Sequence, residues 1–237
     1  MSSGSPPGDP GPSAAGPADV APANSRPGNS GRTSADRASA VSTSAGSRLP
    51  SSRRFVALPI PAEVRERLAA SLPQDPDLAD GVRWTRPDGW HLTVAFLGDV
   101  EDRHVDQLIR TLEVGVATTT IIPKRLAVGE LGTFGRRVLW IGVDPSPEGS
   151  LQALADAVRT ALRRGGFPVD NRPMRPHVTL ARAGRRPVTR TLVEACATAI
   201  TPDHAATLAW TPNVLELWRS DLGDGPARYT TEATIPL

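Results

Sequence analysis

The stretches HLTVAFLGDV at residues 91–100 and HVTLARA at residues 177–183 open on one pattern: histidine, an apolar residue, threonine, an apolar residue. Successive side chains of a β-strand point to opposite faces, so His91 and Thr93 share one face while Leu92 points to the other. The second stretch places its histidine and threonine together in the same way. Each stretch is therefore predicted to be a strand with one face in the core and one polar face.

The repeated pattern, with its histidines 86 residues apart, predicts two similar halves whose polar faces meet at one site. Cleavage of a phosphodiester needs a base that takes a proton from water and an acid that protonates the leaving sugar oxygen. The imidazoles of His91 and His177, with an ordinary pKa of about 6.5, can do either at neutral pH. Thr93 and Thr179 can donate hydrogen bonds to the phosphate oxygens. The pattern therefore favours a phosphoesterase that needs no metal.

A less specific interpretation exists for each of these residues. One His-x-Thr strand is more often a packing feature than a catalyst, but two copies hold two of the four histidines. His104 and His204 are expected on the surface. There is no His-x-His, His-Glu-x-x-His or cysteine pair, so we expect no zinc, and no glycine-rich dinucleotide loop, so we expect no cofactor. Cys196 is the single cysteine and is expected in a helical core.

Strand-like and helix-like segments alternate without the regular spacing of parallel βαβ units. The fold class is therefore predicted to be α+β, with antiparallel-rich sheets and helices on the outside. Strands are expected at 53–60, 91–100, 125–134, 137–143, 175–183, 207–218 and 228–237, and helices at 62–72, 102–117, 147–166 and 188–200. The strands 125–134 and 137–143 should form a hairpin around Gly135.

Composition separates a tail from a folded domain. Of residues 1–50, 35 are Ser, Ala, Gly or Pro, and such a segment buries too little surface to fold. We therefore predict a disordered tail over 1–52 and a single two-lobed domain over 53–237. The chain lacks an apolar run of membrane-spanning length and an apolar N-terminal signal, so we expect a soluble, cytoplasmic monomer with no membrane partner.

The net charge of +2 hides a basic segment. Residues 159–190 hold nine arginines and one acid, Asp170, a local charge of +8. Such a segment fits a phosphate-bearing partner, or an ordinary solvated surface in a chain whose basic residues are nearly all arginine. Charge alone does not decide between the two.

Five stretches together resemble the 2H phosphoesterase superfamily, and within it the bacterial RNA 2′,3′-cyclic phosphodiesterases, also called 2′-5′ RNA ligases. They are RRFVALPIPAEVRERL, RWTRPDGWHLTVAFLGDV, GTFGRRVLWIGV, RPHVTLAR and LELWRSDLGDGPARYT. The resemblance runs from about residue 53 to the C-terminus. It implies a two-lobed, pseudo-symmetric fold with a central cleft, and hydrolysis of RNA or nucleoside 2′,3′-cyclic phosphates to 2′-phosphomonoesters.

The resemblance also implies roles for single residues. His91 would donate a proton to the 3′ oxygen and His177 would accept one from water, while Thr93 and Thr179 hold the phosphate. The alternatives are that the same histidines cleave or join 2′-5′ linkages in RNA, or that the chain binds RNA ends without turnover.

Three further residues are weaker candidates. Arg182 matches a family arginine that approaches the phosphate, but it lies five positions after His177, where strict alternation would put it on the opposite face. It reaches the site only if a β-bulge or a strand end intervenes. Phe134 and Trp90 are candidates for base stacking, with packing in the wall of the cleft as the alternative for both.

Overall fold

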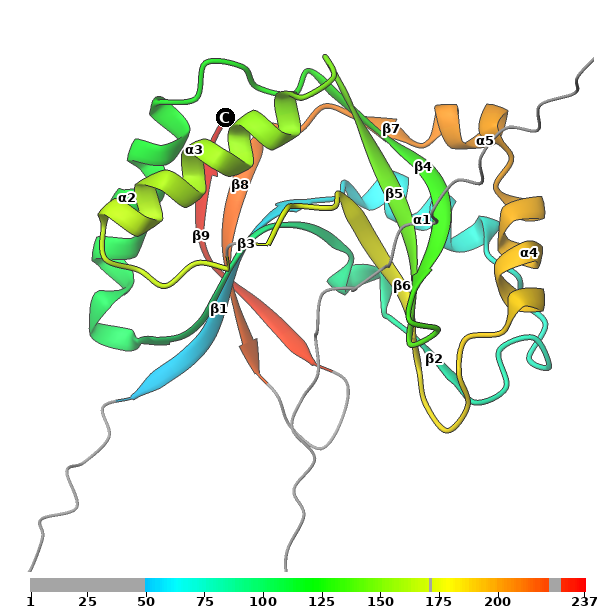
Figure 1. The fold of residues 1–237 in the computed structure, drawn as a ribbon. Coiled ribbons are helices and arrows are strands. Elements are labelled where there is room, and N and C mark those ends of the chain that lie inside the picture. Colours follow the sequence, from blue (N-terminus) through cyan, green and yellow to red (C-terminus); the bar gives the residue numbers. More distant parts are fainter. Residues whose placement is uncertain (1–49, 171, 222–226) are drawn as a thin grey trace, which may run out of the picture.

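The computed structural model describes residues 50–170, 172–221 and 227–237, and they form two antiparallel sheets with helices packed outside (Figure 1). Sheet A has the strand order β3 (His91–Glu101), β1 (Ser51–Pro59), β8 (Val214–Asp221) and β9 (Arg228–Pro236). Sheet B has the order β2 (Val82–Trp84), β6 (His177–Ala183), β5 (Val138–Ser146), β4 (Arg125–Phe134) and β7 (Ala209–Trp210). The predicted α+β class and the β4–β5 hairpin are confirmed.

The helices divide between the two sheets. Their bounds are α1 (Ala62–Ser71), α2 (Val105–Ala117), α3 (Ser150–Arg164), α4 (Arg190–Ala199) and α5 (Pro202–Thr207), with 3-10 turns η1 (Pro87–Gly89) and η2 (Asp102–His104). Helices α2 and α3 pack on each other beside sheet A, whereas α4 and α5 pack against β4 of sheet B (Figure 1). The side chain of Arg67 in α1 donates to Thr207 of α5, so α1 also belongs to sheet B's side.

Neither sheet is built from one half of the sequence. Sheet A combines β1 and β3 with the C-terminal hairpin β8–β9, and sheet B combines the earlier hairpin β4–β5 with β6. The hairpin that follows the first motif in the chain therefore flanks the strand of the second motif. The two motif strands β3 and β6 lie against each other where the sheets meet.

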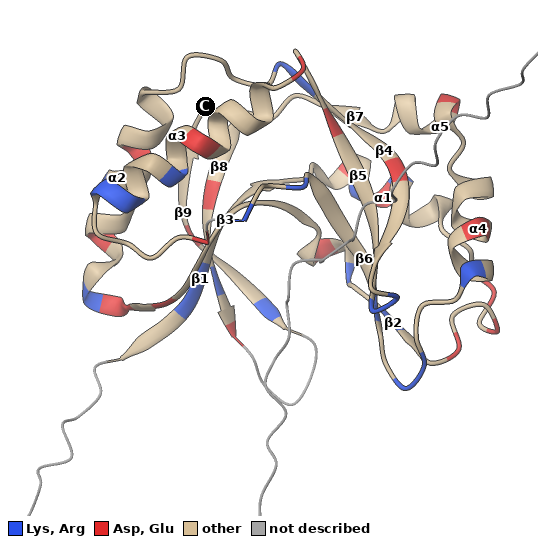
Figure 2. Cartoon of the chain, in the orientation of Figure 1, with Lys and Arg blue, Asp and Glu red and all other residues tan. Residues whose placement is uncertain are grey.

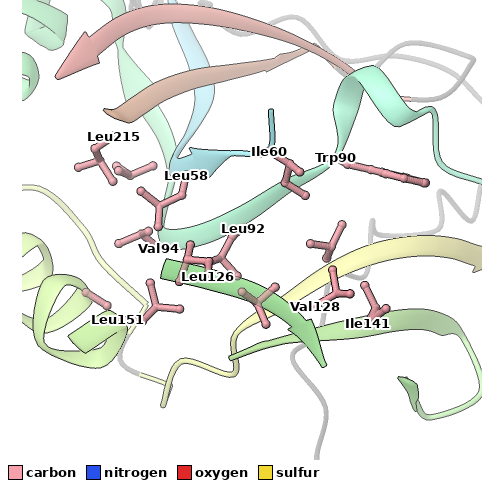
Figure 3. Close-up of a cluster of buried hydrophobic side chains, with 14 of the residues drawn as sticks. Leu58, Ile60, Trp90, Leu92, Val94, Leu126, Val128, Ile141, Leu151 and Leu215 are labelled. Atoms are coloured by element: carbon pink, nitrogen blue, oxygen red, sulfur yellow. The ribbon is translucent and has the colours of Figure 1, made fainter. Parts of the chain in front are cut away.

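One cluster of buried apolar side chains extends through both sheets and α3 (Figure 3). It includes Leu58 and Leu92 of sheet A, Leu126 and Ile141 of sheet B, and Leu151 of α3. Strand β1 is an inner strand and is buried on both faces from Phe55 to Leu58, which explains the continuous apolar run in its sequence.

Cys196 in α4 is completely buried, as predicted. Burial raises the pKa of its thiol to about 11, because a thiolate in apolar surroundings loses its hydration. The protein therefore carries this cysteine as a small apolar core residue.

One predicted strand is wrong. The strand expected at 207–218 is interrupted, because α5 extends to Thr207 and only β7 and β8 are strands. Helix α5 begins at Pro202 because the hydroxyl of Thr201 accepts a hydrogen bond from the backbone N–H of His204, and a proline is favoured in the first helical turn. The predicted tail, 1–52, lies outside the described residues up to position 49, and its last two residues begin β1.

Candidate active site

His91 begins β3 directly after the turn η1, and both the backbone and three aromatic rings hold its side chain. Its Nδ1 lies 2.7 Å from the carbonyl oxygen of Gly89. The ring centroids of Phe55, Trp218 and Tyr229 lie 4.8, 4.9 and 5.2 Å from that of the imidazole. These aromatic residues come from β1, β8 and β9, so sheet A assembles a wall around His91 from segments far apart in the sequence.

His177 begins β6 and has the same backbone contact. Its Nδ1 lies 2.7 Å from the carbonyl oxygen of Arg175, again the residue two positions earlier. The rings of Phe134 and Trp140 lie 5.0 and 6.2 Å from the imidazole, both edge-on. The guanidinium of Arg175 sits 4.4 Å above the Trp140 ring in a cation–π contact.

The shared backbone contact sets the tautomer of both rings. A carbonyl oxygen only accepts hydrogen bonds, so Nδ1 of each histidine carries a proton and donates it to the carbonyl. In the neutral imidazole Nε2 is then the basic nitrogen, and in the charged form it is the second proton donor. Both His91 and His177 are therefore oriented to exchange a proton through Nε2.

The threonines lie on the predicted faces. Thr93 and Thr179 are half-buried, and the residues directly before and after each of them, such as Leu92 and Val178, are buried in the core. This alternation confirms the predicted division of each motif into a core face and a polar face.

A β-bulge follows each threonine. In β6 the pairing with β5 shifts between Thr179 and Ala181, so that Leu180 and Ala181 both point into the core. The strand alternation then restarts, and Arg182 returns to the face of Thr179. The bulge that Arg182 requires is thus present. In β3 the register shifts at the same position of the motif, between Thr93 and Ala95.

The two motifs are tied to each other by one hydroxyl group that sequence reasoning missed. Thr85 Oγ1 lies 2.6 Å from the carbonyl oxygen of Thr179 and 2.8 Å from that of Leu180, and it donates to them. It accepts a hydrogen bond of 2.8 Å from Nε1 of Trp90, the residue before His91. Nothing local in the sequence signals this bridge, because Thr85 and Thr179 are 94 residues apart.

Of the two candidates for base stacking, Trp90 is a correction. It is only 2% exposed, belongs to the main core and uses its indole N–H in the bridge to Thr85, so it offers no face to a base. Phe134 is 9% exposed and is stacked on Trp140, with the ring centroids 5.3 Å apart. Its ring packs beside His177 in the wall of sheet B.

The basic segment does not form one patch. Its arginines are spread along α3, the following loop, β6 and the turn after β6 (Figure 2). Arg159 donates to the carbonyl oxygens of Val94 and Arg172, and Arg172 pairs with Asp170. The hydrogen bond from Arg172 holds the pKa of Asp170 below its ordinary value. Within this segment, Arg175 contacts the wall beside His177 and Arg182 shares the face of Thr179.

Among the described residues, no group of three or more His, Cys, Asp and Glu side chains is placed to hold a metal ion. None of the described helices is long and apolar enough to cross a membrane.

The chain is similar to known RNA-end enzymes in sequence. It is 29% identical over 186 residues to the RNA 2′,3′-cyclic phosphodiesterase of Escherichia coli, covering 75% of this chain and 92% of that protein. It is also 29% identical over 192 residues to the enzyme of the same name from Geobacillus stearothermophilus, covering 78% of this chain. The matched region spans only 57% of the Geobacillus protein.

The structures agree with the sequences. Escherichia coli LigT in its apo form superimposes with a TM-score of 0.60 at 27% identity, covering 78% of this chain and 97% of that one. LigT complexed with 3′-AMP gives a TM-score of 0.61 at 27% identity, with 79% and 99% covered. The sequence model of the 2′-5′ RNA ligase superfamily matches residues 86–224, which include both His-x-Thr motifs. Since this match covers more than half of the chain, the protein belongs to the 2′-5′ RNA ligase superfamily.

Proposed function

We propose that this protein hydrolyses the 2′,3′-cyclic phosphate at RNA ends, or of nucleosides, to a 2′-phosphomonoester. The observation that carries the proposal is the repeated geometry: two histidines, each starting a strand, each with Nδ1 held by the carbonyl two residues earlier, and each followed by a threonine on the same face. The names of the relatives, RNA 2′,3′-cyclic phosphodiesterase, support the substrate class.

The reaction needs one proton to be removed from the attacking water and one to be added to the leaving O3′ oxygen. Neutral His177 takes a proton through Nε2 from a water molecule while the water oxygen forms a bond to phosphorus. The bond from phosphorus to O3′ breaks, and Nε2 of protonated His91 gives its proton to that oxygen. The products are a 2′-phosphate and a 3′-hydroxyl, with His177 protonated and His91 neutral. Proton exchange with solvent restores both rings.

The hydroxyl groups and the arginine have a different task. Thr93 and Thr179 donate to the non-bridging phosphate oxygens, whose negative charge grows in the transition state. Arg182 offsets that charge from the strand β6, on the far side of the bulge. The assignment of donor to His91 and acceptor to His177 rests on the family resemblance, because the geometry of the two rings is nearly the same.

The first experiment removes one imidazole at a time. We expect His91→Ala and His177→Ala each to lower kcat/KM on an oligoribonucleotide with a 2′,3′-cyclic phosphate by about 100-fold to 10,000-fold. EDTA should leave the wild-type rate unchanged. His104→Ala is the matched control, since His104 lies in the turn η2 and is well exposed. Retained turnover in both motif variants would refute the two-histidine mechanism.

The second experiment identifies the product. A 2′-phosphate is expected, and a 3′-phosphate would reverse the assignment of donor and acceptor. Cleavage of 2′-5′ linkages, or joining of the cyclic end to a 5′-hydroxyl through a 2′-5′ linkage, would favour the related phosphodiesterase or ligase reaction if no 2′-phosphomonoester is formed. Stoichiometric binding of cyclic ends without product would instead make the protein a binding module for RNA ends.

A further inference from the structure

The face of sheet B that carries Thr179 continues past Arg182 onto the edge strand β2. Arg83 of β2 is directly opposite Arg182, and residues directly opposite each other in an antiparallel pair share a face. The two neighbours of Arg83, Val82 and Trp84, pack against the main core instead. The side chain of Arg83 is therefore exposed on the same face as the second motif, beside Arg182.

An open hollow of about 480 Å³ lies at the end of β2 and β6. The residues that line it are Gly81, Val82, Arg83, Gly184 and Arg185. The backbone N–H of Gly184 donates to the carbonyl oxygen of Gly81 across 2.9 Å, and a Cβ atom on Gly184 would lie 2.7 Å from that oxygen. A side chain at position 184 would thus force the two segments apart. The hollow combines bare backbone with two arginine side chains.

The arginines at the hollow carry charge that no carboxylate offsets. Within the described part of the chain, neither Arg83 nor Arg185 pairs with an acidic side chain, and the adjacent Asp80 is taken by Arg186 at 2.6 Å. Arg137 lies in the turn between β4 and β5, and its carbonyl oxygen accepts a backbone N–H from the end of β6. Figure 2 shows basic residues at this turn and at the turn after β6. The charge therefore favours an anionic ligand.

The hollow lies within reach of a nucleic-acid strand whose end is held at the motifs. Arg182 follows Thr179 by three positions and Gly184 follows it by five. At about 3.3 Å per residue, the hollow begins roughly 10–17 Å from the phosphate that Thr179 would hold. One or two further nucleotides span this distance, whereas the terminal nucleoside alone does not.

We propose that Arg83, Arg185 and the glycine backbone beside them bind the phosphodiester backbone of the nucleotides that precede the cyclic end. This inference rests on the proposed function and selects its substrate, which is an RNA strand rather than a free nucleoside cyclic phosphate. Guanidinium groups bind phosphate oxygens through two parallel hydrogen bonds. Backbone phosphates are the same in every sequence, so the hollow adds affinity for a longer strand without selecting its bases.

The test compares a substrate that extends to the hollow with one that does not. Cytidine 2′,3′-cyclic phosphate ends at the motifs, and a tetraribonucleotide with the same cyclic end continues beyond them. We expect Arg83→Ala and Arg185→Ala each to lower kcat/KM about tenfold on the tetranucleotide and less than about twofold on the cytidine substrate. Arg83→Lys keeps the charge and should be intermediate. Arg110→Ala, at an exposed arginine of α2, is the matched control.

Changing the substrate gives an independent measurement of the same contact. Uncharged methylphosphonates in place of the internucleotide phosphates should slow the wild type on the tetranucleotide and should slow Arg83→Ala much less. The slope of log kcat/KM against log salt concentration should also be smaller by about 0.7 in each alanine variant. Equal losses on the cytidine substrate and the tetranucleotide, or no loss on the tetranucleotide, would overturn the proposal.

Binding separates this inference from the proposed function. The probe is a fluorescent tetraribonucleotide that ends in a 3′-phosphate, so it has no cyclic bond to open, and its anisotropy reports binding. Wild-type protein should bind this probe more tightly than 3′-AMP, and Arg83→Ala should remove most of the difference. Absence of turnover in the wild type would defeat the proposed function and leave this comparison intact. Equal affinity of the wild type and Arg83→Ala for the probe would show that the hollow does not bind the strand.

Discussion

The two histidines sit in the same backbone geometry but between different walls. Around His91 the wall is an aromatic group from three strands of sheet A, and around His177 it is a tryptophan covered by the guanidinium of Arg175. The contact that sets the tautomer joins each histidine to the carbonyl two residues earlier. Because it depends only on neighbouring residues, both motifs form it. The walls come from the hairpins β8–β9 and β4–β5, which belong to opposite halves of the sequence. The backbone geometry of the two histidines is thus duplicated, while the side chains around them differ.

The largest expected effect of these comparisons is at the two motif threonines, which should be equally important if the two motifs are equivalent. We expect Thr93→Val and Thr179→Val each to lower kcat on a cyclic phosphate by about 100-fold, because each removes one donor to the transition-state oxygens without changing the side-chain volume. Steady-state kinetics measure this. Thr133→Val in β4, where Thr133 pairs with Leu139 away from the face of Thr179, is the control. A change below about threefold at either motif threonine would show that it does not contact the phosphate.

The next effect concerns the two walls. Gly132 is opposite Trp140 in the β4–β5 pairing, and a Cβ atom there would lie 2.2 Å from Cζ2 of the indole. Gly132→Val must therefore displace Trp140, and we expect roughly a tenfold loss of kcat/KM or more. At Gly89 a Cβ would lie 3.3 Å from the Tyr229 ring, so Gly89→Ala should be milder.

A second substitution that replaces the displaced Trp140 ring with a smaller side chain checks the interpretation of the Gly132 variant. If the loss comes from Trp140, then Trp140→Leu added to Gly132→Val should restore the unfolding free energy that overpacking cost, about 1–3 kcal/mol. Equal activity in the Gly132 variant and the wild type would show that the wall of sheet B does not position His177.

The bridge between the motifs predicts a smaller effect. Thr85→Val leaves the indole N–H of Trp90 without its acceptor in a buried position. The expected cost is about 1–3 kcal/mol of unfolding free energy, measured by urea titration, with a loss of kcat of a few-fold as the motifs loosen. Thr85→Ser keeps the hydroxyl and should retain both properties. A stable, fully active Val variant would mean that the Thr85 hydroxyl is not needed to hold the two motifs together.

The smallest effect concerns acid stability on the side of β3. The hydrogen bond from buried Arg54 lowers the pKa of Asp102 below its ordinary value. Asp170, whose pKa is also lowered, donates its backbone N–H to the carbonyl oxygen of Phe96. A carboxyl with a lowered folded-state pKa stabilises the fold above its unfolded-state pKa. This contribution is lost as the pH falls through the folded-state value.

Stability should therefore be level from pH 8 to about pH 5 and should decrease below about pH 4. Asp102→Asn should lower the stability at neutral pH and flatten part of the decrease. Hydrogen exchange should show β3 losing protection in acid before β6. Simultaneous loss in both strands would mean that these carboxyls do not act on β3 separately.

The local features of the site could be predicted because they depend on alternation within one strand. The faces of His91 and Thr93, the hairpin around Gly135 and the buried Cys196 all follow from neighbouring residues. Trp90 could not be assigned in this way. Its position beside His91 suggested a surface for a base, but tertiary packing turned it into the core. The outward placement of Phe96 could not be predicted either, because strict alternation places it in the core face and only the bulge reverses that placement.

The sequence by itself determined most of the elements, the two motifs and the chemistry that two histidines and two threonines can perform. Only the tertiary structure decided which hairpin flanks which motif, where the bulges fall, and how Thr85 joins β3 to β6. The physical reason is how far apart in the sequence the interacting residues lie. Alternation and helical periodicity are set by residues a few positions apart, whereas strand pairing joins distant segments, and a shift of one residue in its register moves every following side chain to the other face.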